Sequence, residues 1–593
     1  MSMDDKALKK KQPKKVVQIL KKKPTVVIGV AATVAIAGII GGILIFVNIP
    51  EEKVLYISYA RLGIGIDPHQ TWAPTDYEII NQVAEGLFIH DSVNGHSRII
   101  NNLAINHSWN ENATEYNFEL RQDVEFHDGN LFNAEAVQWN IERIYTLIDN
   151  GKMHFTKVQD WLFSDGSRII NHTQIINNYT IKFVLNKPYI PLTALLASTS
   201  SSMISPFSAP NDDFLDHYSE DLIGTGPFLY DLWNFNQSLI LSSNPNYWGQ
   251  KPQIDKLIFK FYGTHNDKFD ALLSGELSML SGYNELYSHG DPTYWDSMGI
   301  YDDDILDVFI IHPDIIVEEG PPSTFFDYFL MNNELINVTM RKAISYAFNY
   351  SAYIDKGLNG HVTRLRSPIP EGILYSNTTE INVPYYNITM ARQTLKDVNW
   401  NGIAGALTAN DNITVGNEWE KLLEDGTPVA TYNFSYIAGM LNGIILLNIT
   451  RENLKQIGIK IEAAELSPGE FVQRCWEIPP YHLNMFELSW MGYIPRFNDP
   501  SSIINFLCSN KALDFNYCQI NDSLTQDLME LAISETNETA RKQLYYQIQK
   551  RLIEEIFPMC YLLSRNCFKI YRSNLKGLNV NHFNPVYNNI YFI

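Results

Sequence analysis

Residues 116–143 read YNFELRQDVEFHDGNLFNAEAVQWNIER, and this stretch decides the fold. Apolar and polar residues alternate over 116–120, which predicts a strand. A tight turn is expected at Asp128-Gly129, because this pair tolerates positive φ. A helix should follow, with Asn133 as its N-cap. Its apolar residues recur at helical spacing: Val137, Ile141 and Ile144. The stretch therefore predicts a strand, a turn and an amphipathic helix.

The same stretch carries a recognisable string. Phe126-His127-Asp128-Gly129, followed by Phe132 and Ala134-Glu135, resembles the "FHDG, pF, AeDV" block of solute-binding proteins of peptide-type ABC importers (family 5, the oligopeptide and dipeptide binders). His127 could suggest catalysis, but neither a nucleophile nor a metal partner is close to it in sequence. Its ring and the Asp128 carboxylate are expected to satisfy backbone groups in the turn.

Further strings follow in the order of that family, so the resemblance covers essentially all of residues 50–593. A single short glycine motif would mean little, whereas several long strings in order are specific. They lie at residues 67–69 (DPH), 82–88 (QVAEGLF), 222–228 (LIGTGPF), 244–249 (NPNYWG), 251–259, 337–349, 367–372 and 458–461.

The resemblance implies an α/β fold of the type II periplasmic-binding-protein kind, with two lobes, a hinge and an inserted subdomain. Ligand would be trapped between the lobes by closure. The expected parts are a basic head (1–23), an anchor (24–48), lobe I (49–90, 201–318 and 556–593), the inserted subdomain (91–200) and lobe II (319–555).

Charge is unevenly distributed along the chain. The formal net charge is −21, yet residues 1–23 hold nine lysines against two aspartates, a local +7 that leaves −28 for the remainder. An acidic body argues against nucleic-acid binding, since phosphate contacts need cations. Hydrophobic residues make up 45% and aromatic residues 12% of the chain, which excludes a disordered protein.

Residues 25–47 carry no charge and are rich in Val, Ile, Ala and Gly. Twenty-three residues at about 1.5 Å each span a hydrocarbon core of about 30 Å. The alternative is a cleaved signal peptide, but its apolar part would be shorter and a small-residue cleavage site should follow. No cysteine lies near residue 50 to accept a lipid. We expect an uncleaved, single-pass plasma-membrane anchor with a cytoplasmic N-terminus and an extracellular body.

Glycosylation sequons agree with an exterior location, because all of them follow the expected anchor. They lie at Asn106, Asn112, Asn171, Asn178, Asn236, Asn337, Asn349, Asn377, Asn387, Asn412, Asn433, Asn448, Asn521 and Asn537. An oxidising exterior would also allow a small disulfide-closed loop between Cys508 and Cys518. Related dipeptide binders often carry a similar local pair.

At the candidate ligand site, this sequence differs from the pattern of the family. Peptide binders hold the ligand ammonium with an Asp three residues after a Trp, whereas Trp490-Met491-Gly492-Tyr493 has Tyr493 there. The spacing to Asp499-Pro500 is also longer, and residues 437–445 lack the Arg that dipeptide binders offer to the ligand carboxylate. The predicted pocket residues are Trp490, Met491, Gly492 and Tyr493, with Trp72 and Ala73 opposite, and Asp499 as a replacement carboxylate or a helix cap.

Trp72 could equally be a surface or core aromatic. Because the ammonium-binding Asp and the carboxylate-binding Arg are both missing, two kinds of ligand are possible, a longer peptide or a different organic solute. An extracellular enzyme is disfavoured, because HExxH, GxSxG and Walker A strings are absent. A sensor with the same fold but no transporter is the other alternative. We expect no cofactor, a monomeric ectodomain and an ABC permease as partner.

Overall fold

The computed structural model describes residues 52–59, 65–71, 74–93, 96–153, 155–216, 221–281, 308–358, 362–405, 418–476, 486–509, 516–578 and 586–593. The chain forms two units, Met1–Glu52 and Lys53–Ile593, and all described residues except Glu52 belong to the second. The expected basic head and anchor lie outside the described residues. Among the helices that are described, none has both the length and the apolar character that a membrane crossing needs.

The first sheet has the strand order β1-β10-β9-β8, and β1 (Val54–Tyr59) runs parallel to β10 (Lys256–Phe261). β9 (Ser238–Ser243) and β8 (Phe228–Asn234) extend it in antiparallel fashion. α3 (Pro74–Val83) contacts β8 and contributes Ile79, Ile80 and Val83 to the core beneath the sheet. α7 (His265–Ser274) follows β10 in the chain.

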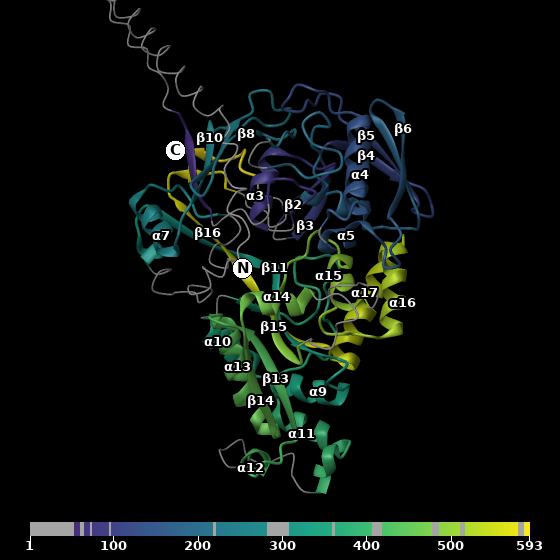
Figure 1. Cartoon of the computed structure of the whole chain (residues 1–593), viewed down its shortest axis with the longest axis vertical. Helices are drawn as coiled ribbons and strands as arrows, with labels where there is room; N and C mark the ends of the chain where they lie inside the picture. The colour runs from purple at the N-terminus through teal and green to yellow at the C-terminus, as the bar shows by residue number, and fades with distance from the viewer. Residues whose placement is uncertain are drawn as a thin grey trace, which may run out of the picture. The chain divides into compact units, whose positions relative to one another are not determined.

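A second sheet, with strand order β4-β5-β7-β6, is formed by residues between α3 and β8. Its strands are β4 (Ala104–Trp109), β5 (Glu115–Leu120), β6 (Ile170–Asn177) and β7 (Thr180–Leu185). α4 (Ala134–Asp149) contacts β6 and β7 (Figure 1). The predicted strand, turn and helix are confirmed: β5 is followed by Gly129 at φ 83°, and the Asn133 side chain accepts a hydrogen bond from Ala136 N at 3.0 Å. The remaining elements here are β2 (Phe88–Val93), β3 (His96–Asn101), α5 (Phe155–Trp161) and α6 (Leu192–Leu195).

The third sheet has six strands in the order β12-β16-β11-β15-β13-β14. They are β11 (Ile315–Met331), β12 (Val362–Arg364), β13 (Ala430–Ile437), β14 (Ile459–Leu466), β15 (Leu488–Tyr493) and β16 (Met559–Arg572). Its helices are α9 (Val338–Ala347), α10 (Tyr350–Leu358), α11 (Ile388–Asp397), α12 (Glu418–Glu424), α13 (Leu441–Leu454), α14 (Pro468–Trp476), α15 (Ser501–Cys508), α16 (Ser523–Ser534) and α17 (Glu538–Arg551). α16 and α17 lie side by side (Figure 1). The short strands β17 (Leu575–Lys576) and β18 (Tyr591–Phe592) pair near the C-terminus.

The two longest strands of the third sheet are β11 and β16, and one end of β16 is linked to the first sheet. β11 and β16 pair from Ile315↔Arg572 to Leu330↔Met559, and the register shifts around Pro322 and Phe326. Pro322 has no N–H to donate, so a break in the ladder is expected there. At the far end, Met279 bridges both Ile57 of β1 and Tyr571 of β16. Met279 therefore links the first sheet to the third.

The string around His127 packs backbone to backbone against the string at residues 222–228. His127 N donates to Gly224 O at 2.9 Å, and its ring Nε2 contacts Gly226 O at 2.9 Å. A Cβ on Gly224 would lie 2.1 Å from Val83 O, so no side chain fits there. The His127 ring thus contacts a backbone carbonyl, as the sequence predicts, but this carbonyl belongs to Gly226 and not to the turn itself.

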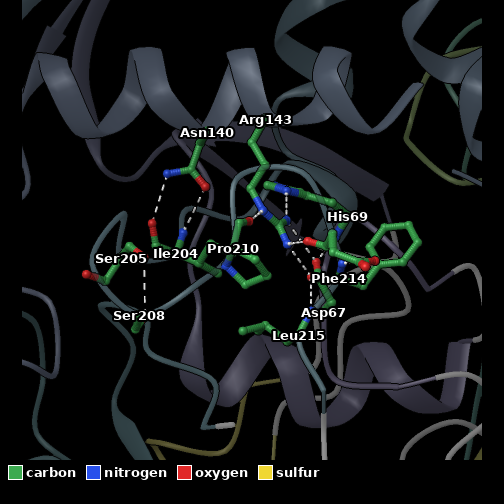
Figure 2. A network of polar contacts seen from close by, with 11 residues as sticks. Asp67, His69, Asn140, Arg143, Ile204, Ser205, Ser208, Pro210, Phe214 and Leu215 are labelled. Atoms are coloured by element: carbon green, nitrogen blue, oxygen red, sulfur yellow. Dashed lines mark hydrogen bonds and ion pairs between the residues drawn. The ribbon is translucent and has the colours of Figure 1, made fainter. Parts of the chain in front are cut away.

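A buried ion pair joins α4 to the loop after β1 (Figure 2). Arg143 and Asp67 are both 0% exposed, with Nη2 and Oδ2 2.7 Å apart. Arg143 also donates to His69 Nδ1 at 2.7 Å and to the Pro210 carbonyl at 2.7 Å. Burial alone would raise the pKa of Asp67, but the charge and hydrogen bonds of Arg143 outweigh it and the pKa is lowered. The stabilisation from ionised Asp67 is therefore present above the unfolded pKa of about 3.9 and is lost as pH falls through the lower folded value.

We predict that Arg143→Met lowers the free energy of unfolding by about 3–5 kcal/mol, because it leaves the Asp67 carboxylate buried without its cation. Urea denaturation at neutral pH measures the change. Arg98→Met is the control, since Arg98 pairs with Asp91 on an exposed hairpin and its side chain is 62% exposed. That substitution should cost less than about 1 kcal/mol. Equal losses in the two variants would contradict a structural role for the buried pair.

Candidate solute-binding site

The four predicted residues from Trp490 to Tyr493 lie on β15, and its alternation divides them between two faces of the sheet. Trp490 and Gly492 face Asp327 of β11. A Cβ on Gly492 would lie 2.9 Å from Phe325 Cζ and 3.3 Å from Asp327 Oδ1. The Asp327 carboxylate pairs with Arg565 at 2.9 Å, and the Trp490 indole is close enough to favour its charged form. Burial outweighs both contacts and raises the pKa of Asp327.

Met491 and Tyr493 lie on the opposite face. The Tyr493 ring stacks on Phe506 of α15 with centroids 3.8 Å apart. Its hydroxyl donates to the Ser502 carbonyl at 2.6 Å. Burial raises the pKa of the Tyr493 hydroxyl. The four predicted residues therefore do not converge on one point, and the polar group of Tyr493 is already used inside the protein.

Asp499 is 2% exposed and belongs to a second buried ion pair. Its Oδ2 lies 2.8 Å from Arg541 Nη2 on α17, and its Oδ1 accepts a hydrogen bond from Ser501 N at 2.9 Å. Ser501 is the first residue of α15, so the carboxylate holds the start of that helix. The sequence suggested such a cap but gave no sign of Arg541, which lies 42 residues further along.

Arg496 and Asp160 form a contact that sequence reasoning missed. Arg496 lies between β15 and α15, and its Nη1 is 2.6 Å from Oδ1 of Asp160 on α5. The two side chains are 11% and 8% exposed. Burial alone would lower the pKa of Arg496, but Asp160 outweighs it and the pKa is raised. The only sequence feature that could have indicated Arg496 is the extra length of the segment between Trp490 and Asp499, in which Arg496 lies.

Three tyrosine hydroxyls lie within electrostatic range of this ion pair. Burial raises the pKa values of the hydroxyls of Tyr77, Tyr189 and Tyr493, and the charge of Asp160 raises each of them further. Tyr77 is on α3, beside the first sheet, whereas Tyr493 is on β15 of the third. Residues of all three sheet regions therefore meet at Asp160 and Arg496.

Trp72 and Ala73 lie outside the described residues, so their place in the pocket stays a prediction. The preceding residues are held by Asp76 at the start of α3. Its Oδ2 accepts hydrogen bonds from Thr71 Oγ1 at 2.6 Å and Gly65 N at 3.1 Å. These contacts connect the loop to the same helix that carries Tyr77.

The predicted bridge between Cys508 and Cys518 is wrong, because the structure has both as free, buried thiols. Cys508 ends α15, and Cys518 packs into the core beside the third sheet. Burial raises the pKa of Cys518 to about 12. The two cysteines are close in sequence, but their sulfur atoms are not bonded. Elsewhere in the described part of the chain, no cluster of three or more His, Cys, Asp or Glu residues could hold a metal ion.

The architecture defines a class of protein: α/β regions in one chain, with buried polar residues where the regions meet, as in periplasmic solute-binding proteins. Residues 98–514 match the sequence model of the bacterial extracellular solute-binding proteins, family 5, middle region. The match spans more than half of the chain, and the chain belongs to this family. The predicted family and α/β binding-protein fold are thereby confirmed.

Individual relatives are distant but similar over their whole length. The chain is 24% identical to the probable D,D-dipeptide-binding periplasmic protein DdpA of Escherichia coli K12, over 92% of this chain and 94% of that one. It superposes on DppA of Helicobacter pylori in complex with the peptide STSA, with a TM-score of 0.68, 21% identity and coverage of 91% and 98%. For NikA of Brucella suis in complex with Fe(III)-EDTA, the TM-score is 0.72, the identity 19% and the coverage 91% and 100%.

We predict that Gly492→Ala lowers the free energy of unfolding by about 1–3 kcal/mol, because the new methyl group would overlap Phe325 and Asp327. Gly469→Ala is a matched control, since a Cβ there meets nothing within 4 Å and the residue lies in α14. The control should be neutral or stabilising by up to about 1 kcal/mol. Thermal or urea unfolding of the two variants tests the close approach of β15 to β11, and a neutral Gly492→Ala would contradict it.

Proposed function

We propose that this protein captures a peptide-like solute between two lobes outside the cell and delivers it, chemically unchanged, to an ABC importer. The observation that carries the proposal is the meeting of α3, α5 and the segment after β15 around the Arg496–Asp160 pair. A buried meeting point of separate sheet regions is where such folds enclose ligands. Membership of a family of extracellular solute-binding proteins supports a binding role rather than an enzymatic one.

We propose the same lobe boundaries that are expected from the sequence. Lobe I comprises 49–90, 201–318 and 556–593, the inserted subdomain 91–200, and lobe II 319–555. β11 and β16 are the hinge of the proposal, because Tyr571 of β16 is linked to the first sheet through Met279 and the register between the two strands is irregular around Pro322. Strands with a broken ladder can bend there at lower cost than in a regular sheet. Ligand contacts with both lobes would then shift the protein toward its closed state.

The solute we propose is a peptide longer than a dipeptide. DdpA is named as a probable D,D-dipeptide binder and DppA was solved with the peptide STSA, which supports peptides as a class. In this chain Tyr493 occupies the position of the ammonium-binding Asp, and its hydroxyl is bonded to Ser502. A zwitterionic dipeptide would forgo charge-assisted bonds of about 1.5–3 kcal/mol each there. Longer peptides gain backbone contacts and aromatic stacking instead. Trp72, Ala73, Trp490, Met491, Gly492, Tyr493 and Asp499 stay in the proposal as residues that form or support the pocket.

The proposal includes tethering of a monomeric, glycosylated ectodomain by residues 24–48. The uncharged stretch at 25–47 and the nine lysines before it support this arrangement. A tether would keep the binding domain close to its permease.

We expect the full chain in detergent to retain short peptides. Native mass spectrometry after incubation with a randomised library of di- to pentapeptides identifies what is bound. A peptide at about 100 times its Kd should stabilise the protein by about 2.7 kcal/mol, visible as a higher Tm. Arg98→Met, altered only on the exposed hairpin, is the binding control and should retain the same peptides. Retention of none of them, with a non-peptide solute bound instead, would refute the peptide part; conversion of a bound solute into product would refute the whole.

Deletion of residues 1–48 should release the protein from membranes. The full chain is expected in the membrane fraction after high-salt and carbonate washes, and the deleted form in the soluble fraction. Substitution of the nine lysines by Gln is the control, because it removes the surface charge but keeps the apolar stretch. A full chain that leaves the membrane in the salt wash would contradict an apolar anchor.

A further inference from the structure

Two β-hairpins of this protein carry the same six-residue pattern at their turns, Trp-Asn-X-Asn-X-Ser/Thr. Residues 109–114 read WNENAT at the turn from β4 to β5, and residues 233–238 read WNFNQS at the turn from β8 to β9. The two hairpins belong to different sheets. The last three residues of each pattern are an N-glycosylation sequon, with Asn112 or Asn236 as the acceptor. Two of the sequons therefore share a context that the sequon itself does not require.

The two turns also share their hydrogen bonds. In each turn, the carbonyl of the Asn after the Trp accepts a bond from the backbone N–H three residues further on, at 2.9 Å for Asn110 and 3.0 Å for Asn234. The side-chain amide of the same Asn donates to the hydroxyl of the sequon. Asn110 donates to Thr114 at 3.0 Å, and Asn234 donates to Ser238 at 3.2 Å. The acceptor Asn is the third residue of both four-residue turns, so the two acceptors occupy the same position.

The acceptor side chains at these turns are accessible. Both residues are exposed, and neither side-chain amide has a hydrogen bond within the described part of the chain. Other sequon asparagines are used by the fold: the side chains of Asn337, Asn387 and Asn537 accept bonds from backbone N–H groups at the starts of helices. A transferase must surround the amide that it modifies, and the tip of a hairpin gives it more room than the start of a packed helix.

Each turn also holds an aromatic ring at the surface. Trp109 is 47% exposed and Phe235 is 52% exposed. Both rings are supported by a second ring, since the centroid of Tyr116 lies 5.8 Å from that of Trp109 and the centroid of Trp233 lies 5.8 Å from that of Phe235. The C–H groups on the face of a pyranose ring are apolar and slightly positive, so they pack well on the negative face of an aromatic ring. A sugar on the nearby Asn would cover aromatic surface that the fold leaves exposed.

We infer that the acceptor residues Asn112 and Asn236 carry N-linked glycans, and that the exposed ring of each turn packs against the first sugar. In the reaction, Nδ2 of the Asn forms a bond to the anomeric carbon of a lipid-phosphate-linked oligosaccharide. The bond from that carbon to the phosphate oxygen breaks, the lipid phosphate leaves with the electron pair, and the amide gives up one proton. The inference rests on the exterior location in the proposed function, and it goes beyond that function by assigning the modification to two particular turns.

Expression of the full chain in eukaryotic host cells that N-glycosylate their secreted proteins tests the inference. Peptide N-glycosidase in heavy-oxygen water converts each modified Asn into a mass-labelled Asp. Mass spectrometry of the resulting peptides then gives the modified fraction at every sequon. Asn112 and Asn236 should both be modified in most molecules.

Replacing one ring at a time tests the aromatic contact. Trp109→Leu keeps an apolar side chain, and it should lower the ratio of modified to unmodified Asn112 at least about twofold while Asn236 is unchanged. Phe235→Leu should have the reverse effect, so each hairpin is the control for the other. Asn178, an exposed sequon in the turn between β6 and β7, should be unchanged in both variants.

Stability gives a second measure of the same contact. Wild-type protein trimmed to a single sugar at each site should have a higher Tm than protein with all sugars removed. In the double variant Trp109→Leu with Phe235→Leu, this difference in Tm should fall to about half or less, because the sugars lose the rings they pack on.

The outcomes separate this inference from the proposed function. If other sequons are modified but Asn112 or Asn236 is not, the inference fails and the exterior location stands. If the ring variants change neither the modified fractions nor the difference in Tm, the rings do not contact a sugar and the inference fails as well. If no sequon is modified while a secreted glycoprotein of the same cells is, the chain does not reach the exterior, and the proposed function fails together with the inference.

Discussion

A charge taken out of water must be given a partner, and this constraint determines how the parts of the chain are joined. Arg143–Asp67 connects the inserted region to the loop after β1, and Arg565–Asp327 connects β16 to β11. Arg541–Asp499 connects α17 to the segment before α15. Replacing such pairs by apolar residues would often be neutral or stabilising, so their stabilising effect alone does not explain them. A paired charge is satisfied in one geometry only, which makes each joint specific.

Much of the fold could be predicted, because its signals are local. Alternation over 116–120, the Asp128-Gly129 turn and the cap at Asn133 each depend on a few neighbouring residues, and all three appear in the structure. The strings around Gly224 and Gly226 identified the family for a physical reason as well. A Cβ on either residue would lie within 2.6 Å of backbone oxygens near Val83, so only glycine allows this contact.

The site was harder to predict, because its contacts join residues far apart in the chain. Arg496 and Asp160 are 336 positions apart, and nothing in the local pattern of either residue indicates the other. The four residues expected to line one pocket divide between the two faces of β15, since residues 490 and 492 face Asp327 while 491 and 493 face α15. The expected disulfide failed for a related reason, because the sequence separation of two cysteines says little about where each side chain packs.

In one buried ion pair both carboxylate oxygens have hydrogen-bond partners, and in another only one oxygen does. This difference affects how solute binding and lobe closure can be coupled. Asp67 is complete without a ligand, so the joint it makes is the same whether or not a solute is bound. Asp160 meets Arg496 of another region and leaves one oxygen without a donor among the described residues. Closing the regions around that oxygen costs desolvation free energy unless a donor enters with it. A solute that supplies the donor binds the closed state more tightly than the open one, and such a difference in affinity is what shifts a two-state equilibrium.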